Sequence, residues 1–191
     1  DSFSVSEEDD GGTEPGAWTF NRSSFPVSMP TSMAVGPDNR LYVSEMFGTI
    51  HAFTLNGAKQ VIAEEVITTL GSRLTLGITI DPASTPGNVI LWVSHSNPST
   101  SAGEVNSGTV TKLSGPGFAT RSDVITGLPR AWAKHAPNSL HFGPDGKLYI
   151  AIGGNTGAGS ANTAATEFGT RAEQPLSAAL MVLFLAVGFH H

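Results

Sequence analysis

After the first 24 residues, short apolar runs alternate with turn residues, and their spacing is that of strands rather than helices. The run at 49–55, Thr-Ile-His-Ala-Phe-Thr-Leu, has a period of two, which places alternate side chains on opposite faces of a strand. Asn56-Gly57 then gives a hairpin signal, and apolar pairs within 61–67 indicate the next strand. Only 14% of the residues are charged and 22 are glycine, which also favours short strands and tight turns. The pattern predicts an all-β fold.

One strand–turn–strand unit occurs twice, as Met-Ala-Val-Gly-Pro-Asp-Asn-Arg-Leu-Tyr-Val at 33–43 and Leu-His-Phe-Gly-Pro-Asp-Gly-Lys-Leu-Tyr-Ile at 140–150. Proline suits the first central position of the turn, and the Asn or Gly after the aspartate tolerates a positive φ. A degenerate copy spans 76–93 with a longer loop. Asp81, in the turn of this copy, lies 43 residues after Asp38 and 64 residues before Asp145. Propeller blades repeat at ~40–50 residues, so the longer interval indicates one blade plus an insertion, which we assign to the polar stretch 94–108.

Two further strands follow the copy at 33–43, namely 49–55 and 61–67. Two more follow the degenerate copy, namely 109–113 and 123–126. Four antiparallel strands make one blade of a β-propeller. The sequence holds two nearly complete blades and the start of a third, whereas closed propellers have four to eight. The expected fold class is therefore all-β, with blades of four antiparallel strands in an incomplete ring. Either the chain is a fragment or it assembles with other chains, because an open ring exposes strand edges.

Three regions of different composition divide the chain. Residues 1–24 are rich in Ser, Glu, Asp and Gly and predict a disordered acidic leader; residues 25–180 carry the partial β-propeller. Residues 181–191 form an aberrant apolar tail that lies outside the blade pattern. The apolar stretch 176–189 has 14 residues and is too short to span a bilayer. It is either a strand that completes a blade or pairs with another chain, or the product of a truncation.

Charge and composition exclude several kinds of partner. The net charge of −6 argues against nucleic acid, and the lack of a ~20-residue apolar run argues against a membrane partner. The absence of cysteine excludes thiolate metal sites, and the six histidines form no metal-binding motif, so no metal ligand is predicted. The chain begins with Asp1 rather than Met and carries the glycosylation sequon Asn21-Arg22-Ser23. Both features favour a secreted, extracellular or periplasmic protein.

The segment 135–154, His-Ala-Pro-Asn-Ser-Leu-His-Phe-Gly-Pro-Asp-Gly-Lys-Leu-Tyr-Ile-Ala-Ile-Gly-Gly, resembles the soluble quinoprotein glucose/sorbosone dehydrogenase family, as do 31–55 and 76–82. Members are secreted six-bladed propellers. The resemblance implies pyrroloquinoline quinone (PQQ) and calcium in a central cavity, where a sugar hydroxyl or an aldehyde is oxidised. It also implies that His135 is the general base that takes the hydroxyl proton while hydride passes to the quinone.

The chain departs from this family at an earlier blade. Catalytic members carry Gln-x-Gly-Leu-Leu-Gly there, and their glutamine contacts the cofactor, whereas this chain has Ser-Arg-Leu-Thr-Leu-Gly at 72–77. Arg73 is therefore the candidate partner of a quinone carboxylate, and a loop salt bridge is its alternative role. We expect His51 and His95 to be structural. The calcium ligands and several basic cofactor contacts of the family belong to later blades that this sequence does not contain.

Two functions follow from these observations. The first is a fragment of a PQQ-type sugar or aldehyde dehydrogenase propeller that is inactive by itself. The second is a non-catalytic propeller module used for binding or assembly. In either case, open blade edges or the apolar stretch 176–189 are expected to support self-association.

Overall fold

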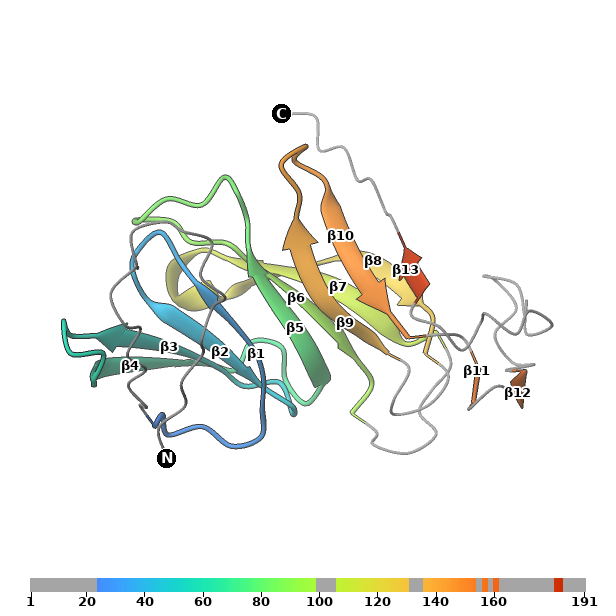
Figure 1. Cartoon of the computed structure of the whole chain (residues 1–191), viewed down its shortest axis with the longest axis horizontal. Helices are drawn as coiled ribbons and strands as arrows, with labels where there is room; N and C mark the ends of the chain where they lie inside the picture. Colours follow the sequence, from blue (N-terminus) through green and yellow to red (C-terminus); the bar gives the residue numbers. More distant parts are fainter. Residues whose placement is uncertain are drawn as a thin grey trace, which may run out of the picture.

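The computed structural model describes residues 24–98, 106–130, 136–153, 156–157, 160–161 and 181–183. These residues form four antiparallel sheets, and the three larger ones stand side by side, from β1–β4 at the left of Figure 1 to β9 and β10 at the right. The only helical element among them is the short 3₁₀ turn η1 (Pro116–Phe118). No helix in the described part of the chain is long and apolar enough to cross a membrane. The all-β prediction is confirmed, while the leader predicted at 1–24 lies outside the described residues except for Ser24.

The first sheet is a complete four-stranded blade in the order β1-β2-β3-β4: β1 (Pro30–Val35), β2 (Leu41–Glu45), β3 (Ile50–Leu55) and β4 (Val61–Ile67). Its first turn has the expected geometry, because Asn39 takes a φ of 60° and its amide donates to the carbonyl of Gly36 at 3.0 Å. In the connection after β3, however, Lys59 rather than Gly57 takes the positive φ, of 63°. Residues 56–60 thus form a wider loop than the Asn-Gly signal indicates.

The second sheet is also a complete blade, in the order β5-β6-β7-β8: β5 (Leu74–Ile80), β6 (Leu91–Ser96), β7 (Gly108–Ser114) and β8 (Thr120–Leu128). The assignment of the whole stretch 94–108 to an insertion is wrong at its start. Ser94, His95 and Ser96 belong to β6 and are fully buried. Their backbones continue the pairing with β5 and β7 and every residue of β6 is buried, so β6 extends further than its apolar run.

The third sheet contains β9 (Pro137–Phe142), β10 (Leu148–Ile152) and β13 (Met181–Leu183), in the order β13-β10-β9. β13 pairs antiparallel with β10, so this part of the apolar tail extends the third blade. The pairing corresponds to the interpretation of the tail as a strand that completes a blade. The rest of 176–189 lies outside the described residues. Two short strands, β11 (Thr156–Gly157) and β12 (Ser160–Ala161), pair with each other.

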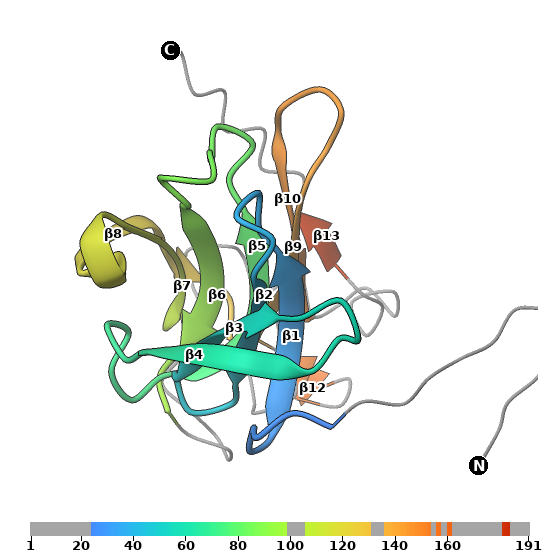
Figure 2. The same cartoon turned by 90° about the vertical axis from the view of Figure 1, so that its left-hand side faces the viewer.

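The sheets pack face to face through two apolar cores. Figure 2 shows the β1–β4 sheet in front of the other two. The core between the first and second sheets includes Tyr42, Ile50, Ile78, Leu91 and Leu113. The core between the second and third sheets includes Trp92, Val110, Leu140, Leu148 and Ile150. Because the second blade is buried on both faces, it fixes the relative positions of the other two, as in a propeller.

The innermost strands β1, β5 and β9 lie next to one another and run in the same direction, upward in Figure 1. The amide of Ile78 in β5 donates to the hydroxyl of Ser32 in β1 at 3.3 Å, and the hydroxyl of Ser94 donates to the carbonyl of Asn138 in β9. At Gly77 the backbones of β5 and β9 approach so closely that a Cβ atom would overlap the Asn138 carbonyl oxygen. All three strands therefore begin at one edge of the molecule.

Candidate functional site

Both residues that the sequence singles out lie next to the start of an inner strand. Arg73 immediately precedes β5, and His135 stands two residues before β9. Because β5 and β9 are neighbours and begin at the same edge, Arg73 lies at the edge where both strands start. His135 lies outside the described residues, so the structure gives no position for its side chain.

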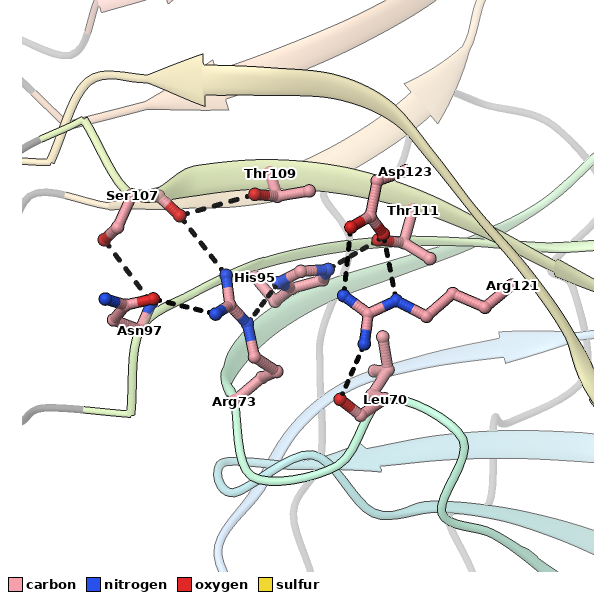
Figure 3. A network of polar contacts seen from close by, with 9 residues as sticks. All are labelled: Leu70, Arg73, His95, Asn97, Ser107, Thr109, Thr111, Arg121 and Asp123. Carbon is pink, nitrogen blue, oxygen red and sulfur yellow. Dashed lines mark hydrogen bonds and ion pairs between the residues drawn. The ribbon is translucent and has the colours of Figure 1, made fainter.

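The half-buried guanidinium of Arg73 binds three groups on the second blade (Figure 3). Its Nε donates to Nδ1 of His95 at 2.9 Å. One terminal nitrogen donates to Oδ1 of Asn97 at 2.7 Å, and the other lies 3.4 Å from the carbonyl oxygen of Ser107. Asn97 and Ser107 are the two ends of the connection between β6 and β7. Arg73 therefore ties the start of the inner strand to that connection.

A row of polar side chains continues from Arg73 across the second blade. Nε2 of His95 lies 2.6 Å from the hydroxyl of Thr111, which in turn donates to Asp123 at 2.6 Å. Arg121 donates to both carboxylate oxygens of Asp123, at 3.0 and 3.1 Å. Burial, together with the charges of Arg73 and Arg121, lowers the pKa of His95 to about 3, so its imidazole is neutral near pH 7. The hydrogen bonds from Arg121 lower the pKa of Asp123.

A second guanidinium lies at the same edge. Arg130 is fully buried at the end of the second blade, and it donates to the carbonyl oxygen of Asn97 at 2.5 Å. Burial lowers the pKa of Arg130, and the nearby charge of Arg73 lowers it further. Asn97 therefore contacts both guanidinium groups, that of Arg73 through its side chain and that of Arg130 through its backbone carbonyl.

The family resemblance implies PQQ and calcium, and the residues at this edge suit PQQ better than calcium. PQQ carries carboxylates, and the guanidinium of Arg73 has the planar donor geometry that carboxylates bind. Calcium needs six to eight oxygen ligands, several of them carboxylates. The part of the chain that the structure describes contains no group of three or more His, Asp or Glu side chains that could hold a metal ion. A calcium site would have to draw on residues outside this part.

A groove of about 430 Å³ runs along the three inner strands. Its walls are residues 32–35 of β1, 78–80 of β5 and 139–141 of β9. Met33 and Val35, which line the groove at β1, are 71% and 68% exposed. The groove is therefore apolar along β1 and more polar along β9, where Ser139 and His141 contribute.

Sequence analysis did not identify most of the residues around Arg73. Asn97 and Ser107 lie in the stretch assigned to an insertion, and Thr111 and Asp123 occupy ordinary strand positions. The structural role expected of His95 agrees with its burial within β6. The sequence does place Arg73 directly before β5, but the polar run Ser94-His95-Ser96 gives no strand signal of its own. A buried histidine on a strand requires a polar partner.

Two stacked four-stranded blades and part of a third define a partial β-propeller. The glucose/sorbosone dehydrogenase family model matches residues 27–173, which is most of the chain, and the chain belongs to that family. The family resemblance seen in the sequence is thereby confirmed. No curated protein sequence gives a significant match.

Solved structures support the same fold. An oxidoreductase from Thermus thermophilus, described as a glucose dehydrogenase, matches with 23% identity over 67% of this chain and 38% of its own, at a TM-score of 0.52. The PQQ-bound aldose sugar dehydrogenase of Streptomyces coelicolor matches with 18% identity over 72% and 41%, at 0.53. The PQQ domain of pyranose dehydrogenase from Coprinopsis cinerea, in its holo form, matches with 15% identity over 70% and 29%, at 0.50. The chain thus spans less than half the length of each of these proteins.

Proposed function

We propose that the chain forms part of a PQQ-dependent sugar or aldehyde dehydrogenase that works outside the cytoplasm. Its cofactor cavity would lie at the edge where β1, β5 and β9 begin. The observation that carries this proposal is the position of Arg73, which is tied to His95, Asn97 and Ser107 at the start of the second inner strand. There it stands close to a second cation, Arg130. An edge with two guanidinium groups suits an anionic cofactor better than a neutral one.

In this proposal the residues of the chain bind and deprotonate, and the quinone supplies the hydride acceptor when it is bound. Arg73 binds a carboxylate of the cofactor and so fixes its orientation. His135, at the corresponding place on the next blade, takes the proton of the sugar hydroxyl, because an imidazole accepts a proton near neutral pH. The groove along β1, β5 and β9 is the proposed path for the sugar.

We further propose that the chain alone does not catalyse oxidation of the substrate. Oxidation requires base, cofactor and substrate to be held together in reactive geometry. The chain covers 38%, 41% and 29% of the three solved structures compared above. Calcium ligands are not assembled within the described residues. The remaining cofactor contacts would come from further blades.

Binding of PQQ to the chain tests the role of Arg73 separately from catalysis. Titration calorimetry with PQQ and calcium should give weak but measurable binding, and Arg73→Leu should weaken it by roughly tenfold or more, the worth of one charge-assisted contact. Arg40→Leu is the matched control, since Arg40 binds Asp38 and Glu65 in the first blade, away from Arg73. Equal loss in both variants would indicate non-specific attraction of an anion and would contradict the proposed site.

A separate observation favours the second function, a binding or assembly module. Met33, Val35 and Val66 are more than half exposed on the face of the first blade that points away from the second. In a propeller, both faces of a blade are covered by neighbouring blades. Another copy of the chain could cover this face, so self-association is part of the proposal for an assembly module.

A further inference from the structure

The hydrogen bonds of the polar row have only one possible direction. Nε of Arg73 can only donate, so Nδ1 of His95 must accept and carries no proton. A neutral imidazole then has its proton on Nε2 and donates it to the hydroxyl of Thr111. That hydroxyl donates to Asp123, because a carboxylate only accepts. The tautomer of His95 is therefore determined by its two neighbours.

The same row fixes the connection between the first and second blades at two points. At one end, His95 binds Arg73, the last residue before β5. At the other end, Arg121, which holds Asp123, also donates to the carbonyl oxygen of Leu70 at 3.0 Å. Figure 3 shows both contacts meeting the loop that leads into β5. The row crosses the blade from β8 through β7 and β6, so its position depends on the rigid sheet and not on the loop.

We propose that His95 is a positioning residue for Arg73: its neutral, Nε2-protonated imidazole, held by Thr111 and Asp123, sets the orientation of the guanidinium that faces the ligand. This inference rests on the proposed function for the role of Arg73, but the geometry that it concerns is a property of the chain itself. It differs from a purely structural role because it requires a particular tautomer and a particular acceptor atom. A buried imidazole of the same shape with the proton on Nδ1 would not bind Arg73.

Nitrogen NMR of the imidazole groups tests this directly in the unmodified chain. We expect the His95 signal to show a protonated Nε2 and an unprotonated, hydrogen-bonded Nδ1, unchanged between pH 8 and pH 5. The charged groups that face this imidazole are Arg73, Arg121 and Asp123, and hydrogen bonds from Arg121 lower the pKa of Asp123. A proton on Nδ1, or a His95 signal that changes between pH 8 and pH 5, would overturn the proposal without any variant.

Variants test the consequence for Arg73. Hydrogen exchange at Nε of Arg73 should be at least about tenfold faster in His95→Phe, which keeps the ring volume but offers no acceptor. His95→Asn keeps an amide oxygen near the place of Nδ1 and should restore most of the protection. His51→Phe is the matched control, since His51 is also buried in a central strand but binds Glu45 and Glu64 in the first blade. Unchanged exchange in a folded His95→Phe protein would contradict the positioning role.

The two proposals fail in distinguishable ways. If the NMR results are as expected but Arg73→Leu binds PQQ as well as the unmodified chain does, the positioning of Arg73 stands and its proposed ligand is wrong. If PQQ binding depends on Arg73 but not on His95, with His95→Phe retaining the affinity of the unmodified chain, the positioning role is wrong. Should His95→Phe fail to fold, Thr111→Val removes the hydroxyl that holds Nε2, so the imidazole is held on one side only and exchange at Nε of Arg73 should become faster. Unchanged exchange in a folded Thr111→Val protein would contradict the positioning role.

Discussion

The indole nitrogen of Trp92 donates a hydrogen bond to the carboxylate of Asp81 at 2.7 Å. The other two turn aspartates make the same kind of contact with the strand that follows. Tyr42 donates to Asp38 at 2.7 Å, and Tyr149 donates to Asp145 at 3.1 Å. The degenerate turn at 81–82 thus makes the same hydrogen bond between an aspartate and an aromatic side chain as the two regular turns, with a tryptophan in place of a tyrosine.

Asp81→Ala should destabilise the chain by about 1.5–3 kcal/mol, the range for a hydrogen bond to a charged group. Trp92 is 1% exposed and belongs to the core between the second and third blades, so the effect should reach both. Urea unfolding followed by tryptophan fluorescence measures it. Asp145→Ala is the control, because the Asp145 turn is exposed, and it should cost clearly less. Equal costs would show that burial of the aromatic partner does not matter.

Local sequence was sufficient for the blades because each strand–turn–strand unit is encoded by neighbouring residues. Asn39 and Gly146 take the positive φ expected of them, at 60° and 74°. The strands of the first two blades follow from apolar alternation and turn residues. The end of β6 was missed, since Ser94, His95 and Ser96 are polar and yet buried, and β8 extends beyond the predicted 123–126 in both directions.

The site could be predicted only in part, because its contacts join residues far apart in the sequence. The position of Arg73 before an inner strand is visible from the strand pattern. Its partners are not, since His95 lies 22 residues away and Ser107 34 residues away. Nothing in the sequence near Thr111 or Asp123 indicates that they complete a row with His95. His135 stays a prediction from the family resemblance, because it lies outside the described residues.

The stability of the chain should fall as the pH decreases from about 6.5 towards 3. The pKa of His95 is about 3 in the folded chain, whereas an unfolded histidine has a pKa near 6.5. Between these values the unfolded chain binds the additional proton, so stability decreases by up to about 1.4 kcal/mol per pH unit. Asp38 and Asp123, whose pKa values are lowered, add to the loss only below about pH 4.

Urea midpoints at pH 7.5, 6.0 and 5.0 measure this dependence. In His95→Asn the slope should be smaller, since the titrating group is gone. An unchanged slope in His95→Asn would mean that other groups cause the acid sensitivity.

The chain should form species larger than its monomer mass of 19.8 kDa. The double change Met33→Lys with Val35→Lys should reduce the mass seen by light scattering, because it places charges on the exposed face of the first blade. Phe47→Lys is the control, as Phe47 is 49% exposed but lies in the turn after β2. Loss of association only when residues 176–189 are deleted would place the contact in the apolar tail. A chain that stays monomeric at high concentration would contradict self-association.

In a complete propeller, His135 should be required for turnover. If the ring is completed with the remaining blades of a related dehydrogenase and becomes active, His135→Ala should lower kcat by ~10²–10⁴-fold, the usual contribution of a general base. His51→Ala should have little effect on kcat, because His51 binds Glu45 and Glu64 in the first blade. An active ring indifferent to His135→Ala would show that the histidine is assigned wrongly.

Sugar-dependent dye reduction by the 191-residue chain, with PQQ and calcium added, tests the central claim most directly. The claim is that this chain supplies one side of the dehydrogenase cavity, with Arg73 and His135, and that the other side comes from further blades. We predict no sugar-dependent rate above that of PQQ and calcium alone. A robust rate that requires the chain and is lost in His135→Ala would show that the chain is a complete enzyme and would contradict the account.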